Sequence, residues 1–242
     1  LVTAEMLAAR FADTGPTLTV AERAANDREW AYGHVVVDEA QELSPMMWRA
    51  LMRRCPSRSM TVVGDVAQVG SAAGTSSWGA VLDRYVAGRW RMEQLTVNYR
   101  TPAQVMALAT EVLHRAGHEV PPPQSVRQGD WPPMARRAQP DGLTAALVEC
   151  VGTELSVLDG GRVAVVTAAG RDAALHEELA AALPPGTVGF GRDTLDSPVS
   201  VLSVTSAKGL EFDGVVVVEP AQILTGSPRG ANDLYVALTR PT

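Results

Sequence analysis

Short, unbroken apolar runs that end in polar residues constrain the fold of this 242-residue chain more than any other feature. Strands buried on both faces of a sheet have such continuous runs, whereas strands exposed on one face alternate apolar and polar residues. Segments of helical length separate the runs, and strands that alternate with helices form parallel sheets. The sequence therefore predicts an α/β protein. The expected strands are His34–Val37, Met60–Val63, Leu95–Val97, Arg162–Thr167, Thr187–Phe190, Val199–Val204 and Val215–Val218.

Helices are expected between these strands, and two of their starts carry a clear signal. Ser44 precedes Pro45, which is the order of an N-cap and a first helical residue. Thr101 and Pro102 are interpreted in the same way. Residues 120–140 are rich in proline and predict an extended linker. The expected helices are Ala4–Phe11, Val20–Trp30, Pro45–Arg54, Trp78–Val86, Pro102–His114, Leu143–Leu158, Arg171–Leu183 and Asn232–Thr239.

Composition narrows the class of protein. Apolar residues make up 46% and charged residues 20%, and the net charge is −6, which excludes a disordered chain or a collagen-like repeat. No apolar run reaches the ~18 residues that a membrane span needs, and two cysteines, Cys55 and Cys150, fit a reducing compartment. We therefore expect a cytoplasmic protein without a membrane partner. The charge balance also argues against autonomous binding of nucleic acid, which clustered basic residues drive.

The basic residues are almost all arginine. Of the 21 Lys and Arg residues, only Lys208 is a lysine, a bias that we attribute to a GC-rich genome. A Walker A loop needs a Lys directly after a Gly to reach the β- and γ-phosphates of a nucleotide. Lys208 follows Ala207, so these 242 residues are not expected to hold a triphosphate by that loop.

Polar residues follow two of the predicted strands in the first half of the chain. Asp38 and Glu39 end the first run; one carboxylate suits Mg²⁺ and a second can activate a water, with an acidic helix start as the alternative. Gly64, Asp65 and Gln68 follow the second run, with an ordinary turn as the alternative. Ligands bind at the carboxyl ends of parallel strands, so two such ends in one sheet favour a ligand site.

Three further segments carry candidate functional residues. Arg100 lies just before a predicted helix, where its planar fork suits an anion, although a surface arginine is the alternative. Lys208 and Glu211 follow the predicted strand that ends at Val204. Arg240 ends the last predicted helix, which by itself is typical of a structural element.

Together, the five segments resemble motifs II to VI of the UvrD/Rep group of superfamily 1 helicases. The matching residues are Asp-Glu-Ala-Gln at 38–41, Gly-Asp-Val-Ala-Gln at 64–68, Asn-Tyr-Arg-Thr at 98–101, Ala-Lys-Gly-Leu-Glu-Phe at 207–212 and Tyr-Val-Ala-Leu-Thr-Arg at 235–240. The resemblance implies RecA-like parallel sheets of the P-loop NTPase type with flanking helices. It further implies part of a first RecA-like domain at 1–94 and most of a second at 95–242.

The resemblance also implies roles for single residues of the first domain. Asp38 is similar to the carboxylate that coordinates Mg²⁺, and Glu39 to the base that activates the attacking water. Gln68 resembles the residue that senses the γ-phosphate. ATP or GTP is the implied substrate, bound with Mg²⁺ in the cleft between the two domains.

Residues of the second domain would complete that cleft. Arg100 and Arg240 resemble two arginine fingers, which stabilise charge during phosphoryl transfer. Glu211 resembles the residue that contacts the ribose, and Gly209 would give close backbone approach. Tyr99 lies in the same motif as Arg100 and is expected to pack near the nucleotide.

The chain also departs from the family pattern. Motif I, the Walker A loop, is missing, so this chain is expected to be a fragment that hydrolyses little or nothing by itself. Residues 69–73 contain none of the aromatics that stack on single-stranded DNA in the family, and Thr205 stands where a histidine is common. The segment between Arg100 and Ser203 is too short for the large inserted domain of processive members.

These departures resemble the HelD branch, whose members act on bacterial RNA polymerase. The leading hypothesis is therefore part of an NTP-driven motor that remodels or recycles RNA polymerase. One alternative is a DNA helicase or translocase of the UvrD/Rep family, with single-stranded or duplex DNA as its partner. A second alternative is a non-enzymatic scaffold derived from a motor domain.

Overall fold

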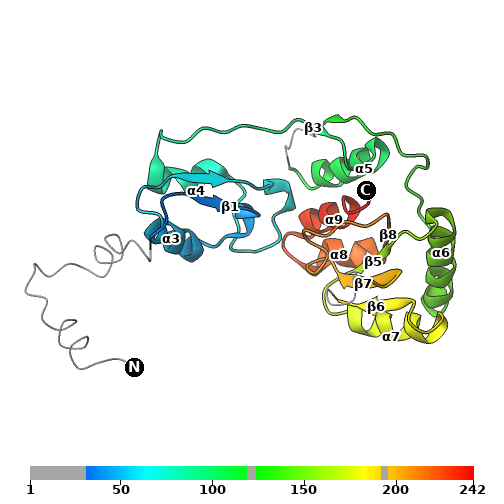
Figure 1. The fold of residues 1–242 in the computed structure, drawn as a ribbon. Coiled ribbons are helices and arrows are strands. Elements are labelled where there is room, and N and C mark those ends of the chain that lie inside the picture. Colours follow the sequence, from blue (N-terminus) through cyan, green and yellow to red (C-terminus); the bar gives the residue numbers. More distant parts are fainter. Residues whose placement is uncertain (1–30, 119–123, 192–195) are drawn as a thin grey trace, which may run out of the picture.

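The computed structural model describes residues 31–118, 124–191 and 196–242. The expected helices Ala4–Phe11 and Val20–Trp30 lie outside the described residues. Within the described parts, the chain is an α/β protein of parallel sheets with flanking helices, so the expected fold class of parallel α/β sheets is confirmed. Figure 1 shows the elements up to α4 on one side of the molecule and the largest sheet on the other.

The first part of the fold is a small parallel pair of strands packed on two helices. Strand β1 (Val35–Val37) pairs with β2 (Met60–Val62), and helices α3 (Pro45–Arg54) and α4 (Trp78–Val86) flank them. Ser44 caps α3 as expected, because its side chain accepts a hydrogen bond from the N–H of Met47 at 3.3 Å. The buried core here contains Val37, Ala40, Trp48 and Leu82.

Each of these two strands is followed by a short 3₁₀ helix. Helix η1 (Ala40–Glu42) comes after β1, and η2 (Val66–Gln68) comes after β2. The side chain of Asp65 caps η2 by accepting from the N–H of Ala67 at 2.9 Å. The polar residues that end the two apolar runs therefore sit on tight turns, side by side at one edge of the sheet.

The second part is a four-stranded parallel sheet in the order β6-β7-β5-β8. Its strands are β5 (Val163–Thr167), β6 (Val188–Phe190), β7 (Val199–Ser203) and β8 (Gly214–Val217). Strands β5 and β7 lie in the middle and are buried at every residue. This explains their unbroken apolar runs, since neither face of the sheet reaches solvent there.

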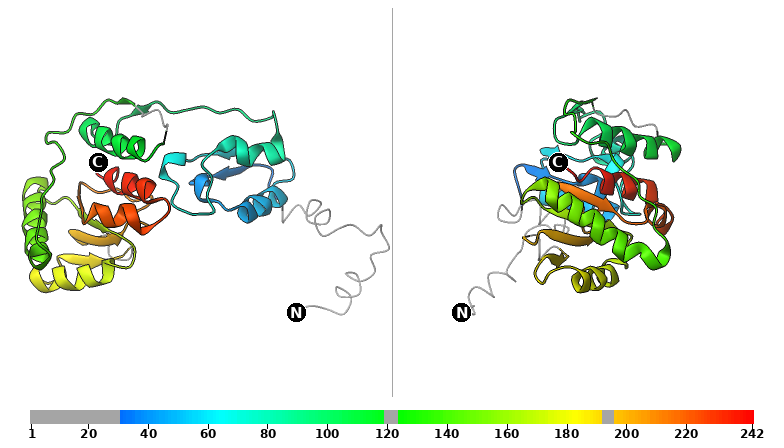
Figure 2. Two further views of the ribbon diagram at one scale, coloured as in Figure 1. Left: turned by 180° about the vertical axis from the view of Figure 1, so that it is seen from behind. Right: turned by 90° about the vertical axis from the view of Figure 1, so that its right-hand side faces the viewer.

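Two pairs of helices cover the two faces of this sheet. Helices α6 (Leu143–Leu158) and α7 (Asp172–Ala182) pack on one face, in a cluster that includes Val165. Helices α8 (Pro220–Gly226) and α9 (Gly230–Leu238) pack on the other, in a cluster that includes Val166. Figure 2 shows the resulting layers from two further sides.

Helix α5 (Ala103–Arg115) forms an additional layer against α9. Just before it, β3 (Val97–Asn98) pairs with β4 (Gln124–Ser125), which lies in the proline-rich stretch, and η3 (Pro140–Gly142) ends that stretch. The prediction that Thr101 caps this helix is wrong: the N-cap is Pro102, which offers no side-chain hydrogen bond, and Thr101 is buried. The N–H of Thr101 instead donates to Oδ1 of Asn98 at 3.0 Å.

Some elements differ from those expected. Strand β3 begins two residues later than expected, and neither β4 nor α8 was expected. Across the described parts of the chain, no helix combines the length and the apolar character that crossing a membrane requires.

Candidate functional site

The candidate site begins at the carboxyl end of β1. Asp38 and Glu39 are exposed there, and Oδ1 of Asp38 accepts a hydrogen bond from the N–H of Glu39 at 2.8 Å. Glu39 has a left-handed backbone, with φ 49° and ψ 35°. Such a conformation costs a residue with a side chain about 1–2 kcal/mol, and it persists where neighbouring contacts hold it.

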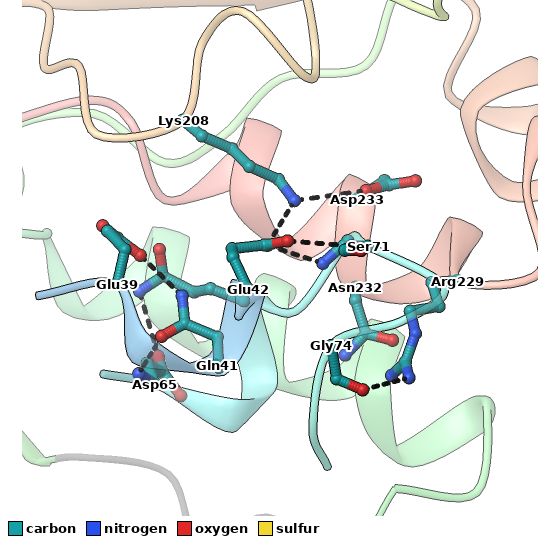
Figure 3. Close-up of polar contacts among 12 residues, drawn as sticks. Glu39, Gln41, Glu42, Asp65, Ser71, Gly74, Lys208, Arg229, Asn232 and Asp233 are labelled. Carbon is teal, nitrogen blue, oxygen red and sulfur yellow. Dashed lines mark hydrogen bonds and ion pairs between the residues drawn. The ribbon is translucent and has the colours of Figure 1, made fainter. Parts of the chain in front are cut away.

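Gln41 supplies one of those contacts. Its side chain is almost fully buried, and its Nε2 donates to Oε2 of Glu39 at 2.5 Å. Its Oε1 accepts from the N–H of Asp65 at 3.1 Å, so one amide joins the ends of both strands (Figure 3). A Cβ on Gly64 would lie 2.3 Å from that Oε1, which explains why a glycine occupies this position.

Gln68 extends the polar chain toward the second part of the fold. Its Nε2 donates to Oδ2 of Asp65 at 3.0 Å, and its Oε1 accepts from Nη2 of Arg240 at 3.0 Å. The two residues that the sequence assigns to nucleotide sensing and to an arginine finger therefore contact each other.

Arg240 is a buried arginine held by hydrogen bonds. Only 3% of it is exposed, and besides Gln68 it donates to the carbonyl oxygens of Val236 and Leu210 at 3.0 Å and 3.3 Å. Burial lowers the pKa of Arg240, and the nearby positive charge of Arg100 lowers it further, whereas the carboxylates of Glu39 and Glu211 oppose this shift. Arg100, Glu39 and Glu211 therefore lie close enough to Arg240 to act on its charge.

Arg100 reaches the same region from the turn after β3. Asn98 shapes that turn, because its Oδ1 accepts from the N–H of Arg100 at 2.9 Å. The guanidinium of Arg100 forms an ion pair with the carboxylate of Glu211, and both side chains are roughly half exposed. Tyr99, in contrast, is 79% exposed and lies on the surface of this turn.

Glu211 lies in the loop between β7 and β8, two residues after Gly209. Gly209 has φ +72°, a conformation that favours glycine. Phe212 directly follows Glu211 and is buried. It forms a β-bridge with Pro241, the residue after Arg240. This bridge fixes the loop beside the end of α9, so Glu211 and Arg240 stay near each other.

The sequence-predicted residues thus divide into two groups. Contacts and charge bring together Glu39, Gln68, Arg100, Arg240 and Glu211. Asp38 lies at the exposed strand end next to Glu39, while Tyr99 points to the surface of its turn. Within residues 31–118, 124–191 and 196–242, no group of three or more His, Cys, Asp or Glu side chains is arranged to hold a metal ion.

Sequence reasoning missed two residues that organise this site. Gln41 lies inside the Asp-Glu-Ala-Gln motif but received no role, and its burial was the missing information. Glu42 accepts hydrogen bonds from the N–H groups of Gly70 and Ser71, at 2.8 Å and 2.9 Å, and from Nζ of Lys208 at 2.8 Å. No local pattern pointed to the contact with Lys208, because the two residues are 166 positions apart.

Comparisons with known proteins find a likeness among solved structures alone. No family model matches the chain, and no curated protein matches it. Among solved structures, the C-terminal domain of a possible DNA helicase from Lactobacillus plantarum WCFS1 is similar at 23% identity and a TM-score of 0.45, over 60% of this chain and 82% of that chain. We therefore base the proposed function on this chain's own residues.

Proposed function

We propose that this chain is part of an NTP-driven, helicase-like motor that hydrolyses ATP or GTP where the two parts of the fold meet. The observation that carries the proposal is the contact between Gln68 and Arg240, at 3.0 Å across 172 positions of sequence. Two motifs that a phosphoryl-transfer site requires thereby lie together, with Glu39, Arg100 and Glu211 around them.

Glu39 is the proposed general base. A carboxylate held by a second group can orient a water and accept its proton, and the amide of Gln41 holds Glu39 in this way. Asp38 would hold Mg²⁺: it offers exposed, hard carboxylate oxygens, and Mg²⁺ is usually bound by one or two carboxylates together with substrate phosphates. When bound, Mg²⁺ neutralises negative charge that develops on the phosphates.

Arg100 and Arg240 have different proposed roles. Arg240 is buried and fixed, so it presents a preset positive charge beside Gln68. Arg100 is half exposed and paired with Glu211. Arg100 can contact a γ-phosphate, and Glu211 a ribose, only after the ion pair between them opens. Nucleotide binding would therefore replace this ion pair with one between Arg100 and the γ-phosphate.

The first experiment measures hydrolysis by the complete protein that carries these residues. We expect Arg100→Ala to lower kcat by about 10³-fold, since arginine fingers contribute at least that much to phosphoryl transfer, and Glu39→Gln to abolish turnover. Arg115→Ala is the matched control, because Arg115 is an exposed arginine paired with Glu111. Equal activity of the Arg100→Ala and Arg115→Ala proteins would contradict the proposal, and absence of any hydrolysis would favour the scaffold alternative.

For the partner, we favour RNA polymerase over DNA. Residues 69–77 contain no aromatic, and the nearest one after Gln68 is Trp78, which is half-buried and packs on the core of the first part of the fold. Stacking contributes about 1–3 kcal/mol per base in single-strand binders, so a loop without aromatics weakens the case for strand tracking.

A second experiment separates these partners. We expect the complete protein to co-purify with RNA polymerase and its hydrolysis to respond weakly to single-stranded DNA. Strong stimulation by single-stranded DNA without binding of RNA polymerase would support the DNA helicase alternative instead.

A further inference from the structure

The only lysine of the sequence makes a contact that none of the roles above uses. Lys208 lies between β7 and β8, and its Nζ is 2.8 Å from Oε1 of Glu42 and 4.0 Å from Oδ1 of Asp233. Its side chain is 20% exposed and that of Glu42 26%. Ion pairs shielded from water in this way are screened less than surface pairs.

The carboxylate of Glu42 joins three segments that are distant in sequence. It belongs to η1, and it accepts from the N–H groups of Gly70 and Ser71 in the following loop and from Lys208 beyond β7. Figure 3 shows Lys208 pointing from the second part of the fold onto this carboxylate, with Ser71 on its other side. Hydrogen bonds of Glu42 therefore connect the end of β1, the loop at 70–77 and the loop before Glu211.

Gly70 leaves the room that the ammonium group occupies. A Cβ built on Gly70 would lie 1.8 Å from Nζ of Lys208 and 2.9 Å from Oδ1 of Asp233. The backbone of Gly70 is not left-handed, so alanine fits there except for this clash. A single methyl group at position 70 should therefore displace the lysine without straining the main chain.

Glu42 and Lys208 each lie close in sequence to a residue with a proposed role at the nucleotide. Glu42 is three residues after Glu39, and Lys208 directly precedes Gly209 and lies three residues before Glu211. We propose that Glu42 and Lys208 form a positioning pair that fixes the loop at 70–77 and the segment at 205–211 relative to each other, and thereby places Glu211 in the site. This inference rests on the proposed function.

The first test uses the 242-residue chain and needs no nucleotide. Because Lys208 is the sole lysine, every Cε–Hε signal of protein labelled with ¹³C-lysine belongs to this residue in NMR spectra. In the wild type we expect two inequivalent ε protons, as for an ordered lysine. In Glu42→Gln and in Gly70→Ala we expect them to merge at the position of an exposed lysine.

Gly142→Ala is the matched control, since a Cβ at Gly142 meets no atom within 4 Å, and it should leave the lysine signal unchanged. The proposed Glu42–Lys208 pair is overturned if the wild type already shows the signal of an exposed lysine. It is also overturned if wild type and Gly70→Ala give the same signal. Gly70→Ala and Glu42→Gln act on different partners, so either variant decides the question if the other does not fold.

The second test measures hydrolysis by the complete protein. We expect Lys208→Met and Gly70→Ala to raise KM about 10-fold with kcat less changed, because the contact of Glu211 with a ribose is made in the ground state and the transition state alike. Lys208→Arg should restore most of the activity because it keeps the charge, and Gly142→Ala should behave as wild type. Wild-type KM in Lys208→Met overturns the positioning role while leaving the proposed function intact. Absence of hydrolysis by the wild type overturns both.

Discussion

At the scale of single residues, one buried and one half-buried polar side chain determine how the candidate site is built. Gln41 joins Glu39 to the N–H of Asp65, and Glu42 joins η1 to the loop at 70–77 and to Lys208. A buried polar group that loses its partner costs about 1–3 kcal/mol. The partners of these two side chains are therefore fixed by the fold and cannot be exchanged for water without loss.

Glu42 provides a prediction about pH. Burial alone would raise the pKa of Glu42, but the hydrogen bond from Lys208 and those from the N–H groups of Gly70 and Ser71 hold it below its ordinary value of 4.5. Because the folded-state pKa is lowered, the stability that Glu42 contributes is present above its unfolded-state pKa. That stability is lost as the pH falls through the lowered value.

We expect Lys208→Met to raise the pKa of Glu42, because the variant removes a charged hydrogen-bond donor. A ¹³C NMR titration of the glutamate carboxyl groups measures this, with Glu42→Gln to assign the signal. Lys208→Arg should keep the pKa low. A pKa unchanged in Lys208→Met would show that the two backbone N–H groups alone account for the shift.

At the scale of elements, η2 is the segment that connects the two parts of the fold. Ala67 packs in a cluster with Met106 and Leu113 of α5 and Tyr235 of α9. Nδ2 of the buried Asn232 donates to the carbonyl oxygen of Ala67 at 2.8 Å. The turn that carries Gln68 is therefore held mainly by helices of the second part, although it follows a strand of the first.

Asn232→Leu tests this docking of η2. The substitution leaves the carbonyl of Ala67 without its buried donor, so we expect the free energy of unfolding to fall by about 1–3 kcal/mol. Urea denaturation measures the change. Thr225→Val is the control, because the hydroxyl of Thr225 makes an exposed hydrogen bond to a backbone carbonyl; its cost should stay within about 0.5 kcal/mol. Equal stability of Asn232→Leu and Thr225→Val would contradict the docking role.

Elements with strong local signals were predictable, and those that depend on distant partners were not. Helices Pro45–Arg54 and Leu143–Leu158 begin and end where the sequence indicates. Strand β3 pairs with β4, whose residues lie in a proline-rich stretch without a strand pattern, so only the pairing itself defines them. Helix α8 is a short helix without a side-chain cap, and Pro220 at its first position was too weak a signal alone to predict it.

At the scale of the whole molecule, the two parts differ in how much core they contain. The second has a four-stranded sheet with a buried cluster on each face. Among its described residues, 31–94, the first has a two-stranded sheet with one small cluster. Two strands alone are at most marginally stable in water, whereas a larger sheet covered by helices folds independently.

Dividing the chain at the predicted domain boundary tests this difference. We expect residues 95–242 alone to unfold cooperatively in urea, monitored by circular dichroism, because both faces of their sheet remain covered. We expect residues 1–94 alone to show no cooperative transition. A cooperative transition of 1–94 would show that its small core suffices, and the absence of one in 95–242 would show that η2 is required.

The sequence by itself determined the parallel α/β class, most of the helices and the positions at which polar residues follow buried strands. These features depend on periodicity and capping, which act over a few neighbouring residues. Only the tertiary structure decided which side chains meet: Arg100 with Glu211, Glu42 with Lys208 and Gln68 with Arg240, at separations of 111, 166 and 172 residues. Such contacts depend on how η2, α9 and the loop after β7 pack together, and no local pattern specifies that packing.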